Sequence, residues 1–511
     1  MKQTNPRPGE WLVYPKGALL IIGVEFWERF SFYGMLSILA LFLTASPTHG
    51  GFGWPATEAL ALVGAYSGAM YALPAVGGYL ADRVLGRRRA VTVGASCMLI
   101  GQIMLASPVF LPELLGWWRG VPLLQTLHEL GVPLGRLVSS AALDAALGQH
   151  GAALDTRAGV SWLTQAYFAA SLGFFAAIAC LIIGNALMKS TLVVLCGETM
   201  RPDDPRREAA YTYYYLGIAI GAMLSGVAVG TVAARFGWHV GFALAAAGMA
   251  VALVSYVSLA PRWLGNIGVN PDGRGRSAGA ARGTAAVPAA EARIEARRRI
   301  GLLLVLALLL CAFSVGWFQL FGSWLLFIER DVDRVIGSFV IPVPWFTSMN
   351  AAVVILLAPP VAALWVRLGA RQQRIDIVQK YIFALSMVAI GHALMYVSAR
   401  NAAATAPASV WIPIVSLSLL AVGELVAWTA TYGMVSRAAP AGFASVAMGA
   451  WYLLTLGLGG YLSGFTGSLI DSFGFATTFG VVAGLMAAAC MAAIVMRAPL
   501  SRLAERAGVT L

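Results

Sequence analysis

Charged residues are scarce in this sequence of 511 residues, because Asp, Glu, Lys and Arg together make up only 11% of it. Soluble domains carry about a quarter charged residues, so this scarcity argues against an ordinary soluble fold. Apolar residues account for 59% of the chain, and the mean hydropathy is +0.77. Apolar runs of about 20 residues, which suffice to cross a bilayer as a helix, recur along almost the whole chain. The sequence therefore predicts an all-α integral membrane protein.

Cysteine is also rare, and several common sequence signatures of catalysis are missing. The five cysteines lie in or beside apolar segments and form no CxxC pair, which excludes a disulfide framework. His128 and His150 lack the spacing of metal ligands, and His392 is isolated in an apolar segment. No HExxH or P-loop motif occurs. We therefore expect no enzyme, no metal site and no cofactor.

The formal charge of +12 could indicate a nucleic-acid partner, but the distribution of arginine favours another explanation. Most arginines lie in short segments between apolar runs and near both ends of the chain. Positive charge in such segments keeps a loop on the cytoplasmic side of a membrane. We therefore expect no nucleic acid, a multi-pass protein of the cell inner or plasma membrane, and cytoplasmic termini.

Hydropathy and periodicity predict about twelve transmembrane helices. The candidates are 17–45, 57–82, 89–107, 168–199, 208–235, 238–259, 300–328, 343–368, 376–398, 408–437, 440–470 and 474–497. Residues 260–299, rich in Gly, Ala and Arg, separate six candidates from six more and predict a cytoplasmic linker. The predicted units are an N-terminal bundle (1–259) and a C-terminal bundle (300–511). Residues 108–166 are too long for a simple connection and predict an external insertion of short amphipathic helices.

Five ionisable residues lie inside apolar segments, where each is costly and therefore a candidate for function. They are Glu25, Glu28, Arg29, Lys189 and Glu424. Spacings of three and four place the first three on one helix face. At about 1.5 Å of rise per residue, Glu28 and Lys189 reach similar depths, and Glu424 lies near the midplane in the other half. These depths predict a charged cavity between the two halves.

Within this set three carboxylates face two cations, so one negative charge lacks a fixed partner. That carboxylate could accept a proton or a cationic group of a substrate, which makes proton coupling physically available. The alternative is a permanently satisfied ion cluster that braces the helices.

The sequence GGYLADRVLGRRR after the second candidate helix combines small residues with an acid and a basic turn. It resembles the cytoplasmic hairpin of major facilitator transporters, where the hairpin latches two bundles. The matching positions are Gly78, Asp82, Arg83, Gly86 and Arg87. Its acid is placed to accept hydrogen bonds from arginines at the membrane surface.

A longer motif, GVEFWERFSFYGM at 23–35, resembles the ExxERFxYYG signature of proton-dependent oligopeptide transporters in the major facilitator superfamily. Further matches follow in family order through both halves: GNALMKS, DPRREAAYTYYYLGIAIGA, WFTSMN, GEL at 423–425, and PAGFASVAMGAWYLL. The resemblance implies a major facilitator fold and alternating access, with di- or tripeptides bound at the midplane.

The resemblance also assigns expected roles. Proton coupling and gating would fall to Glu25, Glu28, Arg29 and Lys189. A peptide carboxylate would bind near Tyr33, Tyr71 and Lys189, and an amino terminus at Asn350 and Glu424. The expected substrate site is completed by Gln319, Trp428, Trp451 and Thr455. Trp451 would wall a side-chain pocket, and Trp428 would either narrow it or face lipid.

Three positions depart from the family pattern. Leu36 stands where the family usually has arginine, Gln319 where it has glutamate, and Ala219 where it has asparagine. The joint loss of that arginine and glutamate leaves the net charge unchanged and predicts a neutral outer gate held by packing. One fewer cation would also weaken the binding of a substrate carboxylate.

These observations predict a proton-coupled symporter of di- or tripeptides or peptide-like small molecules, with the proton as coupling ion. The alternative is a facilitator or exporter of a non-standard peptide-derived or amide substrate with weakened carboxylate recognition. We expect a monomer in a lipid bilayer.

Overall fold

The computed structural model describes the backbone of residues 14–46, 49–107, 157–200, 204, 207–271, 289–370, 375–404, 406–438, 444–507 and 509. Two predicted features lie largely outside these ranges. They are the external insertion up to residue 156, with His128 and His150, and the centre of the linker at 272–288.

Helices make up nearly all of the described chain. The first half contains α1 (Lys16–Thr44), α2 (Ala56–Ala72), α3 (Pro74–Leu80), the π-helical turn η3 (Ala81–Leu85), α4 (Arg87–Ala106), α8 (Arg157–Glu198), α9 (Arg207–Phe236) and α10 (Trp238–Trp263). The second half contains α11 (Ala289–Phe318), η4 (Gln319–Phe321), α12 (Ser323–Asp331), α13 (Trp345–Ala370), α14 (Ile377–Ala404), α15 (Trp411–Ala438), α16 (Ala444–Tyr452), η5 (Leu453–Gly457), α17 (Leu458–Gly467) and α18 (Ile470–Arg506).

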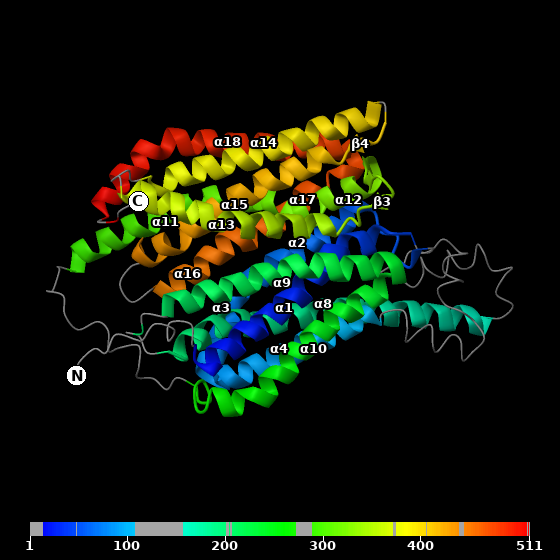
Figure 1. Ribbon diagram of the computed structural model, residues 1–511, viewed down its shortest axis with the longest axis horizontal. Helices are drawn as coiled ribbons and strands as arrows, with labels where there is room; N and C mark the ends of the chain where they lie inside the picture. The colour runs from blue at the N-terminus through cyan, green and yellow to red at the C-terminus, as the bar shows by residue number, and fades with distance from the viewer. Residues whose placement is uncertain are drawn as a thin grey trace.

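Only short strands accompany the helices in the described residues. The strands β1 (Val332–Asp333) and β4 (Ala408–Ser409) pair in parallel, and β2 (Val335–Ile336) and β3 (Phe339–Val340) form an antiparallel pair. They lie together at one end of the second half (Figure 1). They tie connecting segments together and contribute nothing to a sheet core.

The prediction of an all-α membrane protein is confirmed. Eleven helices among the described residues are long and apolar enough to cross a membrane. The expected helix at 440–470 is present as α16, η5 and α17 in succession, and its many glycines lower its hydropathy. In Figure 1 the helices of the first half lie on one side of the molecule and those of the second half on the other.

Helix boundaries differ from the prediction where helices extend past the apolar spans. The helix α8 begins at Arg157, inside the predicted insertion, although its apolar span begins at Ser171. Both ends of the predicted linker are helical as well, because α10 continues to Trp263 and α11 begins at Ala289. Hydropathy marks the part of a helix that lipid surrounds, whereas Ala, Glu and Arg can continue the helix beyond it.

Two interruptions between helices follow from the local sequence. Pro74, at the start of α3, lacks the N–H that would continue α2, so α2 ends before it. Gly86 adopts a φ of 78°, a left-handed value that favours glycine, and this turn starts α4. The predicted hairpin is formed at this turn.

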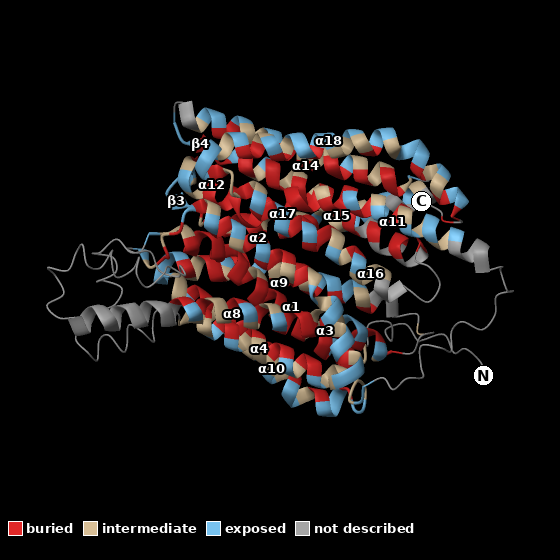
Figure 2. Ribbon diagram, turned by 180° about the vertical axis from the view of Figure 1, so that it is seen from behind, coloured by how far each residue is buried: buried red, intermediate tan, exposed pale blue. Residues whose placement is uncertain are grey.

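Burial follows the helix faces. Buried residues occupy the faces where helices meet, and exposed residues occur on the outward faces (Figure 2). Glycines allow the closest approach of the two halves: a Cβ atom on Gly64 of α2 would lie 2.4 Å from the Cα atom of Gly464 in α17. A Cβ atom on Gly230 of α9 would likewise lie 2.4 Å from Pro344, just before α13. The two halves are therefore joined along two glycine-lined interfaces.

Candidate functional site

The helix α1 carries a buried ion cluster of Glu25, Glu28 and Arg29, whose exposed fractions are 3%, 1% and 2%. Arg29 forms a bidentate pair with Glu28: its Nη2 donates to Oε1 at 2.7 Å, and its Nε donates to Oε2. The same Nε lies 3.3 Å from Oε1 of Glu25, one helical turn away. One guanidinium thus serves both carboxylates, and the predicted clustering of these three residues is confirmed.

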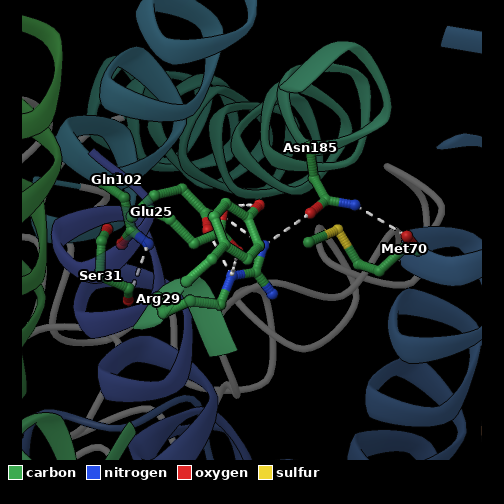
Figure 3. Close-up of polar contacts among 8 residues, drawn as sticks. Glu25, Arg29, Ser31, Met70, Gln102 and Asn185 are labelled. Atoms are coloured by element: carbon green, nitrogen blue, oxygen red, sulfur yellow. Dashed lines mark hydrogen bonds and ion pairs between the residues drawn. The ribbon is translucent and has the colours of Figure 1, made fainter. Parts of the chain in front are cut away.

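Two further residues complete this cluster, and our reading of the sequence missed both. The Tyr214 hydroxyl of α9 donates to Oε2 of Glu25 at 2.6 Å. Asn185 of α8 accepts from Nη2 of Arg29 at 3.3 Å, and its own amide donates to the carbonyl of Met70 at 2.7 Å. Figure 3 shows Asn185 lying between Arg29 and Met70. The only sequence signal for Asn185 is its position one turn before Lys189, and Tyr214 stands among four tyrosines of similar appearance.

Lys189 of α8 is held by an aromatic ring. Its Nζ lies 3.9 Å from the ring centroid of Tyr71, a cation–π contact. Within the described residues no carboxylate lies within ion-pair distance of this ammonium. Lys189 nevertheless interacts electrostatically with Arg29, Glu25 and Glu28. These interactions agree with the prediction that Glu28 of α1 and Lys189 of α8 lie at similar depths. Among the described residues, however, Lys189 has no direct carboxylate partner in this conformation.

The second half carries a different centre. Glu424 of α15 accepts two hydrogen bonds at the same oxygen, Oε2: one from Nε1 of Trp317 at 2.8 Å and one from Nδ2 of Asn350 at 2.9 Å. The pairing of Asn350 with Glu424 matches the expectation. Trp317, at the end of α11, is a donor that our reading of the sequence did not identify.

Aromatic side chains connect the two centres. Tyr33 of α1 stacks on Phe321 with ring centroids 6.0 Å apart, and the edge of Tyr71 contacts Phe318 at 5.8 Å. Trp317 contacts both phenylalanines, at 4.9 Å and 5.4 Å. Rings of the first half therefore touch rings of the second half directly between Lys189 and Glu424.

Gln319 is fully engaged within the second half. Its Nε2 donates to the hydroxyls of Ser463 and Thr466 at 3.1 Å and 2.8 Å, and its Oε1 accepts from Ser323. It also lines a small cavity between α2, η4 and α17, which Ser67 faces from the first half. These bonds are all neutral, and Leu36 is only 1% exposed.

Two predicted tryptophans are both buried. Trp428 is 7% exposed and packs edge-on against Phe313 at 6.0 Å, which excludes the lipid-facing alternative. Trp451 is buried, and its Nε1 has no hydrogen-bond partner among the described residues. Thr455 donates to the backbone carbonyl of Trp451 at 2.7 Å across the π-helical turn η5. Such π-turns often mark functional positions in helices.

The hairpin lies against its own half. Asp82 accepts from Nε of Arg87 at 2.8 Å, and Nη1 of the same arginine pairs with Glu198 of α8. The expected contact between the hairpin acid and an arginine is therefore present. The neighbouring Gly78 approaches Ser190 so closely that a Cβ atom there would lie 2.8 Å from the serine hydroxyl, whereas Arg83 is exposed.

At the end that we expect to face outward, polar contacts join the two halves. Asp471, at the start of α18, accepts from both the backbone N–H and the hydroxyl of Thr57 at 2.6 Å, next to the start of α2. Nε1 of Trp345 in α13 donates to Thr231 of α9 at 2.9 Å. These contacts hold the outer ends of both interfaces together.

Comparisons with known proteins agree on one family. The model of the POT family matches residues 88–272 and 276–485. The chain is 25% identical to the peptide transporter YePEPT of Yersinia enterocolitica, over 90% of this chain and 88% of that protein. It is 24% identical to the dipeptide and tripeptide permease A of Escherichia coli, over 91% and 88%. A crystal structure of a peptide transporter POT in complex with sulfate matches the fold with a TM-score of 0.76 and 22% identity, covering 98% of this chain and 97% of that one.

Proposed function

The chain belongs to the POT family, and from that premise we propose that it is a proton-coupled symporter of di- or tripeptides or peptide-like small molecules. It is a multi-pass membrane transporter, and we place it in the cell inner membrane with both termini in the cytoplasm. Transport would proceed by alternating access between the two halves. The relatives are named as peptide transporters, which supports a peptide-like substrate.

One observation carries the substrate class: a cation and a carboxylate lie on opposite halves with aromatic rings between them. Lys189 and Tyr71 would receive the carboxylate end of a peptide, and Glu424 with Asn350 would receive its ammonium group. Tyr33 lies on the carboxylate side, and Trp451 would contact a substrate side chain. A ligand with both charges would therefore bridge the two halves.

The α1 cluster supports proton coupling. Arg29 contacts both Glu25 and Glu28, so a change of partner at one carboxylate alters the proton affinity of the other. A substrate carboxylate that draws Lys189 away would leave two glutamates facing one arginine. A proton on Glu25 or Glu28 would offset that change, and its release would follow when Lys189 returns.

A facilitator or exporter of an amide-type substrate is the second candidate. The buried Leu36 and the neutral bonds of Gln319 favour it, because neither position provides a charge for gating or for a substrate carboxylate.

Uptake by purified protein in liposomes tests these proposals. We expect accumulation of a labelled dipeptide when the outside is more acidic than the inside, and none when the gradient is collapsed. Exchange that continues unchanged without a gradient would favour the facilitator. Failure of every dipeptide and modified peptide to move would reject both candidates.

A further inference from the structure

The two centres differ in net charge. In the first half, Glu25 and Glu28 face Arg29 and Lys189, and Glu28 and Lys189 each interact electrostatically with the other three members. Two carboxylates against two cations give a formal charge of zero. This cluster is therefore balanced without any ligand.

Glu424 has no such balance. Its partners are Asn350 and Trp317, both neutral donors, and no Lys, Arg or His among the described residues interacts with it. The titratable groups that do face it are the phenols of Tyr33 in α1 and Tyr215 in α9. Phenols are neutral near pH 7. Counted as formal charges, the interior therefore has one negative charge without a cation, and it belongs to Glu424.

The atoms around Glu424 are arranged to accept further hydrogen bonds. Both donors bind Oε2, so Oε1 accepts no hydrogen bond from the described residues. The Oδ1 atom of Asn350 is buried without a donor. Leaving the buried Asn350 oxygen unsatisfied is costly, and an ammonium group placed there would donate to it and to Oε1 of the partly exposed Glu424.

Building on the proposed function, we propose that this transporter recognises its substrates by net charge: a ligand with one ammonium and no carboxylate completes the site, whereas a zwitterion requires one additional proton. The ammonium of a C-terminally amidated dipeptide cancels the charge of Glu424 and leaves the first cluster balanced. A zwitterionic dipeptide brings an extra carboxylate to Lys189. One proton taken up by a carboxylate then restores neutrality.

The two cations of the first cluster, Lys189 and Arg29, already face Glu25 and Glu28. A substrate carboxylate that pairs with Lys189 therefore removes one of the two cations that balance Glu25 and Glu28. The amide of the same peptide avoids this exchange.

Three probes test the rule on the full-length protein: the dipeptide Ala-Phe, its C-terminal amide, and N-acetyl-Ala-Phe. Dissociation constants would be measured between about pH 5.5 and pH 7, where α-amino groups remain protonated. The acid binds with one more proton than the amide. The dissociation constant of the acid divided by that of the amide should therefore rise about tenfold for each unit of increase in pH. This expectation holds whether or not the empty site is protonated. N-acetyl-Ala-Phe should bind at least about tenfold more weakly than Ala-Phe.

The variant Glu424→Gln removes the charge while keeping the size of the side chain. In this variant the acid should bind more tightly than the amide throughout the pH range. The matched control Glu505→Gln changes an exposed glutamate of α18 and should leave both constants unchanged. If the variant does not fold, the ratio for the natural protein still decides the question.

A ratio that stays constant with pH, while both ligands bind, would overturn the charge rule and leave peptide transport intact. The absence of both binding and counterflow for all three probes would instead reject the proposed function, and the charge rule with it.

Discussion

The ion cluster of α1 and the carboxylate of α15 solve the same problem in different ways. Both place acids inside apolar, membrane-spanning helices. Glu25 and Glu28 are stabilised by a buried guanidinium, whereas Glu424 is stabilised by an indole N–H and an amide. A centre balanced by charges needs no ligand, while a centre held by neutral donors keeps its negative charge. In formal charge, the first half is therefore balanced, whereas the second half has a carboxylate without a cation among the described residues.

Removing Arg29 should have the largest effect, because it would leave two buried carboxylates without their shared partner. We expect Arg29→Met to destabilise the protein by about 3–5 kcal/mol, measured as a lower thermal unfolding temperature in detergent. Arg497→Met is the control, since Arg497 pairs with Asp376 near the surface and should contribute about 1 kcal/mol or less. Equal effects of the two changes would contradict the role of Arg29.

Removing Lys189 should abolish coupled uptake without unfolding the protein. Because Lys189 is the cation that a substrate carboxylate would recruit, Lys189→Gln should abolish accumulation of Ala-Phe against its gradient. Folding should remain, since Lys189 makes no direct ion pair among the described residues. The measurement is uptake into liposomes with an imposed pH gradient, beside a thermal unfolding curve. Normal accumulation in this variant would show that proton coupling does not depend on Lys189.

Changing the indole donor tests the second centre. Trp317→Phe keeps the ring contacts with Phe318 and Phe321 but removes the hydrogen bond to Glu424. That bond stabilises the ionised form of Glu424 by about 1.5–3 kcal/mol. Without it the carboxyl group holds a proton more readily, so amine-bearing ligands should bind up to about tenfold to hundredfold more weakly.

A structural role for the ring alone would affect all ligands equally, so N-acetyl-Ala-Phe is measured beside Ala-Phe amide. Trp345→Phe is the matched control, because it removes an indole bond to Thr231 at the outer end. It should leave amine affinity unchanged.

The smallest effect is expected at the outer contact. Asp471 satisfies the N–H of Thr57 at the start of α2 from the other half of the molecule, like a helix cap. Asp471→Ala should destabilise the conformation in which the two halves meet at this end by about 0.5–2 kcal/mol. The readout is the rate at which an impermeant thiol reagent labels Ser67→Cys in the cavity between α2 and α17.

The control for this experiment is Asp376→Ala, which removes an ion pair that lies within the second half. It should not alter the labelling rate. A faster rate in both variants would point to general destabilisation rather than to opening between the halves.

The sequence predicted the fold and most of the charged residues of the site for specific reasons. Apolar runs located the membrane helices, and an acid in such a run is conspicuous, as at Glu424. Polar neutral partners carry no comparable signal. Asn185 and Tyr214 bind the α1 cluster from helices more than 150 residues away along the chain, and nothing in their local sequence sets them apart.

The sequence by itself determined that this chain is a membrane protein, that acids outnumber bases by one among the five ionisable residues of its apolar segments, and which helices carry those residues. Hydropathy and formal charge are properties of residues, so no tertiary structure is needed to count them. Only the tertiary structure decided where the unbalanced charge lies. Arg29 can serve either glutamate, Lys189 can face a ring or a carboxylate, and Trp317 reaches Glu424 only after α11 packs beside α15. Pairing in a low-dielectric interior depends on distances of a few ångströms between helices, and residue order does not fix those distances.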